Sequence, residues 1–378
     1  MIKRLHLKNF KSHRDTELTT NPLTIISGVN NVGKSSVLHA LLLLRQTFKR
    51  GKLGEGLVLN KPLIEMGRGN DVLYKFAQEP ILAIELTTED SLLSFRYRVD
   101  ENELDGSLLP LNDGNMSILS ASTDTLFSRD FQYLSSLRIG GESDFSIDTD
   151  EAVTEKQISY EKGKGELIGN YLYAYQDAPT YDYINNSDET LPLLDEVMYW
   201  EGLISSGVTI NVQKKADKPG FTIFYGTKGR DGKKSIEGLR AENIGFGVSY
   251  SLPVVTALLS AKPGALILVE NPEAHLHPEG QAELARLMCL VAQRGIQVIV
   301  ETHSDHIING VLVNCKRFEK EGYGIDRENV SMYYFSGQDE EHAVIYEQIQ
   351  VLPGGQIDYQ PKGFFDRIVY DRGYLIRD

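Results

Sequence analysis

The segment Gly28–Ser36, with the sequence GVNNVGKSS, restricts the fold of this chain more than any other. It fits the pattern G-x-x-x-x-G-K-[ST]. The defining positions are Gly28, Gly33, Lys34 and Ser35. The apolar run LTII (23–26) precedes the segment and VLHALLLL (37–44) follows it, which predicts a strand before it and a helix after it. This is the setting that a phosphate-binding loop requires, whereas a glycine-rich turn before a surface helix would not need these flanks.

Each residue type in the loop has a chemical reason. The glycines let the backbone curl so that its amide N–H groups and the helix N-terminus point at a polyphosphate. Lys34 reaches the terminal phosphates, and Ser35 offers its hydroxyl to Mg²⁺. The predicted nucleotide-binding residues of the loop are Asn30, Asn31, Gly33, Lys34, Ser35 and Ser36.

Composition limits the remaining possibilities. A chain of 378 residues is long enough for one large or two ordinary domains, and no apolar run approaches the ~20 residues of a membrane span, so we expect a cytoplasmic protein. Cys289 and Cys315 lack metal-ligand spacing, so we expect both to be packing thiols. The net charge of −14 argues against coating nucleic acid by charge alone. Residues 1–79 hold 13 Lys and Arg against 6 Asp and Glu, but exposed basic residues more commonly serve solubility.

The rest of the chain alternates between strand and helix patterns. Alternation at Ile2, Leu5, Leu7 and Phe10 predicts two short strands before the loop, and the glycines of 51–56 end the helix after it. Two antiparallel hairpins are predicted, at 81–99 and at 208–226. The later elements predicted are strand 266–269, helix 278–294, strand 296–300, helix 304–313 and a closing β segment.

A second group of polar residues follows the later strands. Glu270 ends the apolar run 266–269 at the start of ENPEAHLHP, and a carboxylate at the tip of a buried strand is how phosphate-loop enzymes hold Mg²⁺. His303, in HSD after strand 296–300, is a candidate to stand near the γ-phosphate. Without the upstream loop, a helix-capping or core histidine would be the preferred interpretation of His303.

These motifs, in this order, resemble ATP-binding-cassette ATPases of the SMC, RecF and OLD class, and especially the short AAA-ATPase-like proteins of bacterial anti-phage defence loci. The motifs that carry the resemblance are LKNFKS (7–12), GVNNVGKSS (28–36), YLSSLR (133–138), NIGFGVS (243–249), ENPEAHLHP (270–278), ETHSDH (301–306) and PKGFFDR (361–367). The resemblance implies an α/β cassette of the ABC type with an antiparallel β lobe and an inserted helical lobe. It also implies that two cassettes clamp ATP and Mg²⁺ head to tail.

By this resemblance, Gly245, Gly247 and Ser249 form the signature segment that contacts the γ-phosphate held by the other subunit. Small residues before an apolar helix also let N–H groups approach an anion, although a plain helix cap at Ser249 fits the same pattern. Asn271 stands where such cassettes usually carry a catalytic Glu, and an amide cannot act as a base.

We therefore predict Glu270, Glu273 and His303 as catalytic residues, with Ser35 and Glu270 at Mg²⁺ and Glu273 polarising the water. The competing assignment gives the base role to Glu270. By the same resemblance, His277 stands where the D-loop aspartate usually is. His275 or His277 would then take part in communication between the ATP sites, or be a hydrogen-bonded structural residue.

The predicted organisation is one cassette. Its segments are an N-terminal lobe (1–100), an inserted helical and β lobe (101–240), a segment with signature, Walker B and His-loop (241–316), and a C-terminal β appendage (317–378). SMC-type coiled coils are not found between the motifs. The about 75 residues after His303 are too few for a Toprim domain of the OLD nucleases, so we expect no intrinsic nuclease.

The expected function is an ATPase that dimerises around ATP and Mg²⁺ and acts as a sensor or scaffold for a separate effector, such as a nuclease or toxin, in anti-phage defence. One alternative is a RecF-like repair ATPase that binds DNA. Another is a nucleotide-binding assembly switch with little hydrolysis.

Overall fold

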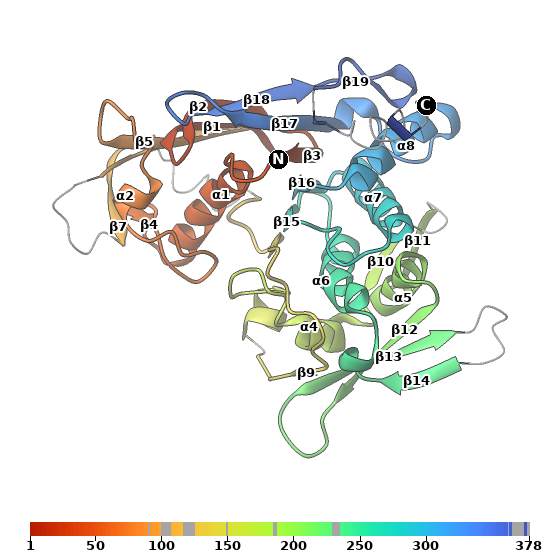
Figure 1. Ribbon diagram of the computed structural model, residues 1–378. Coiled ribbons are helices and arrows are strands. Elements are labelled where there is room, and N and C mark those ends of the chain that lie inside the picture. Colours follow the sequence, from red (N-terminus) through yellow and green to blue (C-terminus); the bar gives the residue numbers. More distant parts are fainter. Residues whose placement is uncertain are drawn as a thin grey trace. The chain divides into compact units, whose positions relative to one another are not determined.

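The computed structural model describes residues 1–89, 91–99, 107–115, 125–148, 150–183, 187–228, 235–361, 363–364 and 374–375. The chain forms two compact units, whose elements are labelled in Figure 1. Unit 1 comprises Met1–Phe127, Glu301–Asp305 and Asp326–Asp378. Unit 2 comprises Ser128–Val300 and His306–Ile325. The short segment Glu301–Asp305 thus returns to the unit that carries the phosphate loop.

Unit 1 contains a curled antiparallel sheet with the strand order β2-β1-β5-β6-β7-β4. Its strands are β1 (Ile2–Phe10), β2 (His13–Thr19), β4 (Gly56–Val58), β5 (Ile81–Thr88), β6 (Leu92–Arg98) and β7 (Leu108–Asn115). In β1 the side chains of Ile2, Leu5, Leu7 and Phe10 are all at most 1% exposed. Leu5 and Leu7 share one face, as alternation predicts, whereas a register shift between Ile2 and Arg4 and the positive φ of Asn9 interrupt the alternation at the two ends of the strand. The predicted hairpin 81–99 is confirmed by the antiparallel pairing of β5 with β6.

The phosphate loop of unit 1 lies between β3 (Leu23–Gly28) and α1 (Lys34–Lys49). β3 pairs in parallel with β17 (Val330–Gln338), which pairs antiparallel with β18 (Val344–Ile349). β17 therefore belongs to the sheet that carries the loop, whereas the sequence analysis places it in a C-terminal appendage. The pattern misleads because an apolar strand shows its length but not its neighbour.

The remaining elements of unit 1 are short. They are α2 (Gly69–Val72), β19 (Val351–Leu352), β20 (Gln356–Ile357) and two 3₁₀ turns, Arg327–Asn329 and Pro353–Gly355. Of the tail motif PKGFFDR, Lys362 and residues 365–367 lie outside the described residues. Phe364 packs edge to face on Tyr334 of β17, with 5.3 Å between the ring centroids. The described part of the tail motif is therefore tied to the sheet of unit 1.

Unit 2 builds its core from parallel strands and helices. β8 (Phe131–Leu134) pairs in parallel with β15 (Leu266–Glu270). Every residue of β15 and of β16 (Gln297–Glu301) is buried, and only the last residue of β16, Glu301, belongs to unit 1. Strands covered on both faces read as continuous apolar runs, which is why the sequence identifies them. The helices of this unit are α4 (Ile168–Tyr175), α5 (Leu193–Ile204), α6 (Phe246–Ser260), α7 (Pro278–Gln293) and α8 (Asp305–Glu321), with a π-helical turn at Asp150–Thr154 and a 3₁₀ turn at Ala241–Asn243.

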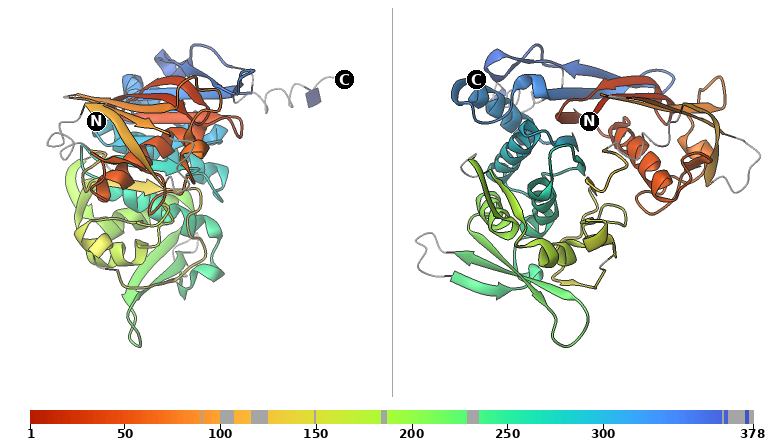
Figure 2. Two further views of the ribbon diagram at one scale, coloured as in Figure 1. Left: turned by 90° about the vertical axis from the view of Figure 1, so that its left-hand side faces the viewer. Right: turned by 180° about the vertical axis from the view of Figure 1, so that it is seen from behind.

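A second antiparallel sheet packs against α4 and α5 of unit 2, as Figure 2 shows. It contains β12 (Val208–Lys214), β13 (Phe221–Lys228), β14 (Ser235–Leu239) and β9 (Asp144–Phe145). β12 and β13 confirm the predicted hairpin 208–226. β10 (Pro179–Asp182) and β11 (Ser187–Pro192) form a separate pair.

The two cysteines of the chain lie in the interior. Cys289 and Cys315 are both buried, and burial raises the pKa of the Cys289 thiol, as expected for packing residues.

Helix α8 extends beyond the predicted end at residue 313 to Glu321. Among the described residues, no helix has the length and apolar character needed to cross a membrane.

Candidate functional site

The backbone of the phosphate loop adopts conformations that need glycine. The φ angles of Gly28, Asn31 and Gly33 are 140°, 64° and 113°. A Cβ atom on Gly28 would stand 2.1 Å from the carbonyl oxygen of Phe335, and one on Gly33 would stand 2.2 Å from Oγ of Ser12. Two reasons therefore favour glycine at both positions: the backbone has a positive φ angle, and neighbouring atoms leave no space for a Cβ atom.

The β1–β2 turn is hydrogen-bonded to the backbone of the phosphate loop. Nε2 of His13 lies 3.0 Å from the carbonyl oxygen of Gly33, and Oγ of Ser12 donates to the carbonyl of Val32 at 3.2 Å. Because a carbonyl only accepts, Nε2 carries the proton and Nδ1 of His13 accepts from the hydroxyl of Thr16. Burial lowers the pKa of His13 to about 4, so the ring is neutral at pH 7. The motif LKNFKS therefore matters because its turn holds the loop.

Lys34 and Ser35 begin helix α1 directly after the loop. The side chain of Lys34 is only 4% exposed, and its Nζ donates to the carbonyl oxygen of Val29 at 2.5 Å. Burial lowers the pKa of Lys34, while the charge of Glu301 acts in the opposite direction. Among the described residues, no side chain caps the start of α1. The N–H of Ser36 donates to the carbonyl of Gly33, and the Lys34 ammonium is folded back across the same loop. The start of a helix has N–H groups without intrahelical acceptors, which favours an anion there.

Glu301 is a contact of the loop that the sequence analysis does not predict. Oγ of Ser35 donates to Oε1 of Glu301 at 2.9 Å. Glu301 is the last residue of β16, and the next N–H, that of Thr302, donates to the carbonyl of Ile26 in β3. An acidic residue ending an apolar strand is the signal used for Glu270, and the same signal is present at Glu301. His303, two residues further, is exposed.

Glu270, at the tip of β15, is held by donors of unit 2. Its Oε1 accepts from the hydroxyl of Tyr133 at 3.0 Å, and its Oε2 accepts from the N–H and the hydroxyl of Ser136 at 3.2 and 3.3 Å. The residue is 7% exposed. Both partners, Tyr133 and Ser136, belong to the motif YLSSLR. The motif therefore positions the carboxylate of Glu270.

Arg138 of the same motif is buried and bonded to backbone carbonyls. Nη1 donates to the carbonyls of Ser135 and Glu270, each at 2.7 Å. Nη2 donates to that of Asn271 at 2.7 Å, and Nε to that of Tyr250 at 3.2 Å. Burial lowers the pKa of this guanidinium to about 10, which leaves it charged at pH 7. Arg138 thereby ties the tip of β15 to helix α6.

The predicted signature residues lie at the start of α6. Gly245 caps the helix without a side-chain hydrogen bond, and an added Cβ there would meet open space. Ser249 is buried, and its Oγ donates to the carbonyl of Phe246 and accepts from the N–H of Gly141. Its hydroxyl is thus used inside unit 2, and the exposed backbone at Gly245 is the part of the segment that an anion can reach.

The two histidines of HLHP have different surroundings. The ring of His275 packs on those of Tyr250 and Phe246, with centroid distances of 4.6 and 6.2 Å. His277 is the N-cap of α7, and its Nδ1 accepts from the N–H of Glu279. His277 therefore matches the structural alternative of the sequence analysis, while His275 connects the turn after β15 to α6.

The predicted site residues divide between the units. Unit 1 carries the loop residues Asn30, Asn31, Gly33, Lys34, Ser35 and Ser36, together with His303. Unit 2 carries Glu270, Glu273, Gly245, Gly247 and Ser249. Within unit 1 the structure adds Glu301 to the predicted set, and within unit 2 it adds Tyr133, Ser136 and Arg138.

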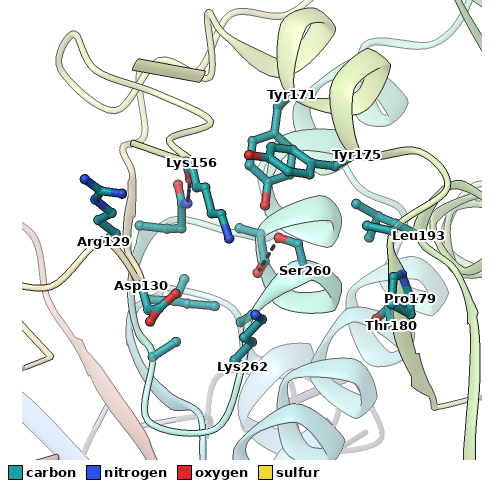
Figure 3. Close-up of a pocket in the computed structure, with 16 residues that line it drawn as sticks. Arg129, Asp130, Lys156, Tyr171, Tyr175, Pro179, Thr180, Leu193, Ser260 and Lys262 are labelled. Carbon is teal, nitrogen blue, oxygen red and sulfur yellow. Dashed lines mark hydrogen bonds between the residues drawn. The ribbon is translucent and has the colours of Figure 1, made fainter. Parts of the chain in front are cut away.

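A cavity of about 200 Å³ lies elsewhere in unit 2 (Figure 3). Tyr171 and Tyr175 of α4 form one wall, and the amines of Lys156 and Lys262 point into the space. None of the predicted site residues lines this cavity. It is therefore separate from the phosphate loop and from the tip of β15.

Protein-family models match several parts of this chain. Residues 99–309 match a family model described as "AAA domain, putative AbiEii toxin, Type IV TA system". The chain belongs to this family. Residues 1–188 match a model described as AAA ATPase domain, and residues 325–369 match a family of unknown function, DUF3696. The predicted relationship to ATPases of this class is thereby confirmed.

A named relative and two solved structures extend the comparison. The chain is 23% identical over 335 residues to a protein named OLD nuclease from Thermus scotoductus, covering 84% of this chain but only 61% of that protein. An SMC head bound to the C-winged helix domain of ScpA has a TM-score of 0.54 at 15% identity, covering 93% of this chain and 98% of the other. The SMC head domain from Thermotoga maritima has a TM-score of 0.50 at 13% identity, covering 93% and 99%. These likenesses confirm the predicted fold, an ABC-type P-loop ATPase.

Proposed function

We propose that this protein binds ATP with Mg²⁺ and hydrolyses it. The observation that carries this proposal is the loop of unit 1, where three left-handed backbone positions precede Lys34 and Ser35 at an uncapped helix start. Curled backbone, a buried ammonium and a hydroxyl are what a polyphosphate and its metal ion require. A hydroxyl and carboxylates are the hard oxygen donors that Mg²⁺ prefers, and the ion would supply positive charge against the phosphates.

The chain's own groups have distinct roles in this proposal. Lys34 exchanges its bond to the carbonyl of Val29 for phosphate oxygens, because a phosphate is the stronger acceptor. Glu270 serves as the Walker-B acid, and Glu273 polarises the attacking water while His303 orients it. The backbone carbonyl of Asn271 accepts from Arg138, and the side-chain amide of Asn271 lacks a basic oxygen for this task. The alternative with Glu270 as the base predicts normal turnover for Glu273→Gln.

A pair of molecules completes the proposed ATP site. The uncapped start of α6 at Gly245 and Gly247 would offer backbone N–H groups to the γ-phosphate of a partner copy. Support comes from the SMC-head fold and from the exposed side chain of Phe246, which is 59% accessible. Ser249 would act indirectly, by holding this helix start against Gly141.

The biological role proposed is control of a separate effector, such as a nuclease or toxin, in anti-phage defence in the cytoplasm. The family description and the OLD nuclease relative support this role. A RecF-like ATPase would instead show salt-sensitive, ATP-dependent binding to duplex DNA. An assembly switch would bind ATP but scarcely turn it over.

Lys34→Ala tests the ATPase proposal. Loss of a charged donor to phosphate should lower ATP affinity at least about tenfold and abolish turnover. Calorimetric ATP titration and phosphate release measure both. Lys49→Ala, an exposed lysine on the same helix, is the matched control and should behave as wild type. Full activity in correctly folded Lys34→Ala would refute the assignment.

A further inference from the structure

We infer that Glu301 is a magnesium-site residue, which fixes the hydroxyl of Ser35 for the cation and supplies negative charge beside it. The inference rests on the proposed ATPase function and assigns this role to a carboxylate of unit 1 itself. The two residues of the contact, Ser35 and Glu301, both belong to unit 1.

The position of Glu301 is set by the backbone rather than by a mobile side chain. Its carboxylate is 5% exposed at the end of β16, and the N–H of Thr302 is bonded to β3 immediately before the loop. The N–H of Ser304 donates to the hydroxyl of Thr302, which stabilises the turn that follows. A buried carboxylate at a fixed strand end is pre-organised in a way that an exposed acid is not.

The direction of the Ser35 hydroxyl carries the chemical argument. Its single proton is donated to Oε1 of Glu301 at 2.9 Å. The lone pairs of the same oxygen therefore remain available to a cation. A carboxylate in this place makes the hydroxyl a better ligand and blocks the orientation in which its proton would face the metal ion.

Charge balance supports the same role. In the described structure the ammonium of Lys34 is close enough for Glu301 to favour its charged form. When Lys34 turns to phosphate oxygens, a buried carboxylate would lose this compensation, and a buried charge without compensation is costly. Mg²⁺ that arrives with ATP restores it. Glu301 thus has a positive charge in its surroundings in both states.

The carboxylate of Glu270 is in a different situation. Both of its oxygens accept hydrogen bonds from Tyr133 or Ser136 of unit 2. Glu301 instead contacts the hydroxyl that the phosphate-loop pattern assigns to Mg²⁺. The two carboxylates can therefore be separated by experiment.

The test measures ATP affinity by calorimetry with excess Mg²⁺ and with EDTA, for wild type, Glu301→Gln, Glu270→Gln and Glu340→Gln. Glu340 is an exposed acid of unit 1 and serves as the matched control. Glu301→Gln keeps the shape of the side chain but removes its charge. We expect at least a tenfold loss of the Mg²⁺-dependent gain in affinity, with affinity in EDTA unchanged or higher, because a negative charge near the phosphates has been removed.

A loss of affinity that is confined to the Mg²⁺ condition distinguishes a metal-site role from misfolding, which would weaken binding in both conditions. Full retention of the Mg²⁺-dependent gain in Glu301→Gln, or an equal loss with and without Mg²⁺, would overturn the inference alone. Absence of ATP binding by the wild-type protein would overturn the proposed function and this inference with it.

Discussion

Glu201 provides a test of the packing between α5 and α6. Its side chain is fully buried, and burial raises its pKa to about 8 from the ordinary value of 4.5. Oε2 accepts from the hydroxyl of Ser251 at 2.8 Å, while Oε1 has no hydrogen-bond partner among the described residues. Burial, with the charge of Glu201 as a further cause, raises the pKa of Tyr225, which stays neutral below pH 9. Glu201 is therefore the group whose titration this test follows.

The sign and size follow from linkage between protonation and folding. The folded protein keeps a proton on Glu201 between about pH 4.5 and pH 8, while the unfolded chain has released it. The free energy of unfolding therefore falls as the pH rises through this window. Glu201 lowers the free energy of unfolding by about 3 kcal/mol at pH 7 and by about 5 kcal/mol well above pH 8. Glu201→Gln removes the titration and should be the more stable protein at high pH.

Urea unfolding followed by the fluorescence of Trp200, the single tryptophan, reports directly on this region. The advantage of Glu201→Gln over wild type should grow by about 3 kcal/mol between pH 5 and pH 8. Asp195→Asn removes an exposed charge from the same helix and should follow the wild-type curve. Parallel curves for wild type and Glu201→Gln would show that Glu201 does not keep its proton in the folded protein.

Two further substitutions test the supports of the site. Arg138→Met leaves four carbonyl groups without their donor, so its free energy of unfolding should fall by about 3 kcal/mol or more; a urea midpoint equal to that of wild type would contradict the observed bonds. Gly28→Ala places a methyl group against the Phe335 carbonyl at positive φ and should abolish ATP binding measured by calorimetry. Gly337→Ala, where a Cβ meets open space, is its control, and normal binding by Gly28→Ala would refute the required loop conformation.

The local patterns of the sequence determine much of this protein. The phosphate loop follows from nine consecutive residues, and its glycines occupy the conformations that the pattern requires. β5 with β6 and β12 with β13 are recognisable because strand pattern and turn adjoin in the chain. The predicted signature segment and the carboxylate of Glu270 are likewise visible as short motifs beside apolar runs. Such features depend on neighbours in sequence.

Only the tertiary structure decides what these motifs contact. Ser35 and Glu301 are 266 positions apart, so no local pattern connects them. The N–H of Gly141, 108 positions away, donates a hydrogen bond to the hydroxyl of Ser249. That hydroxyl is therefore engaged within unit 2, whereas the sequence predicts that it contacts the γ-phosphate. Arg138 appears in the sequence only as the end of the motif YLSSLR, and its burial follows from carbonyls of three separate segments that meet around it. Hydrogen-bond partners of buried polar groups are supplied by packing, and packing brings together residues that the order of the chain keeps apart.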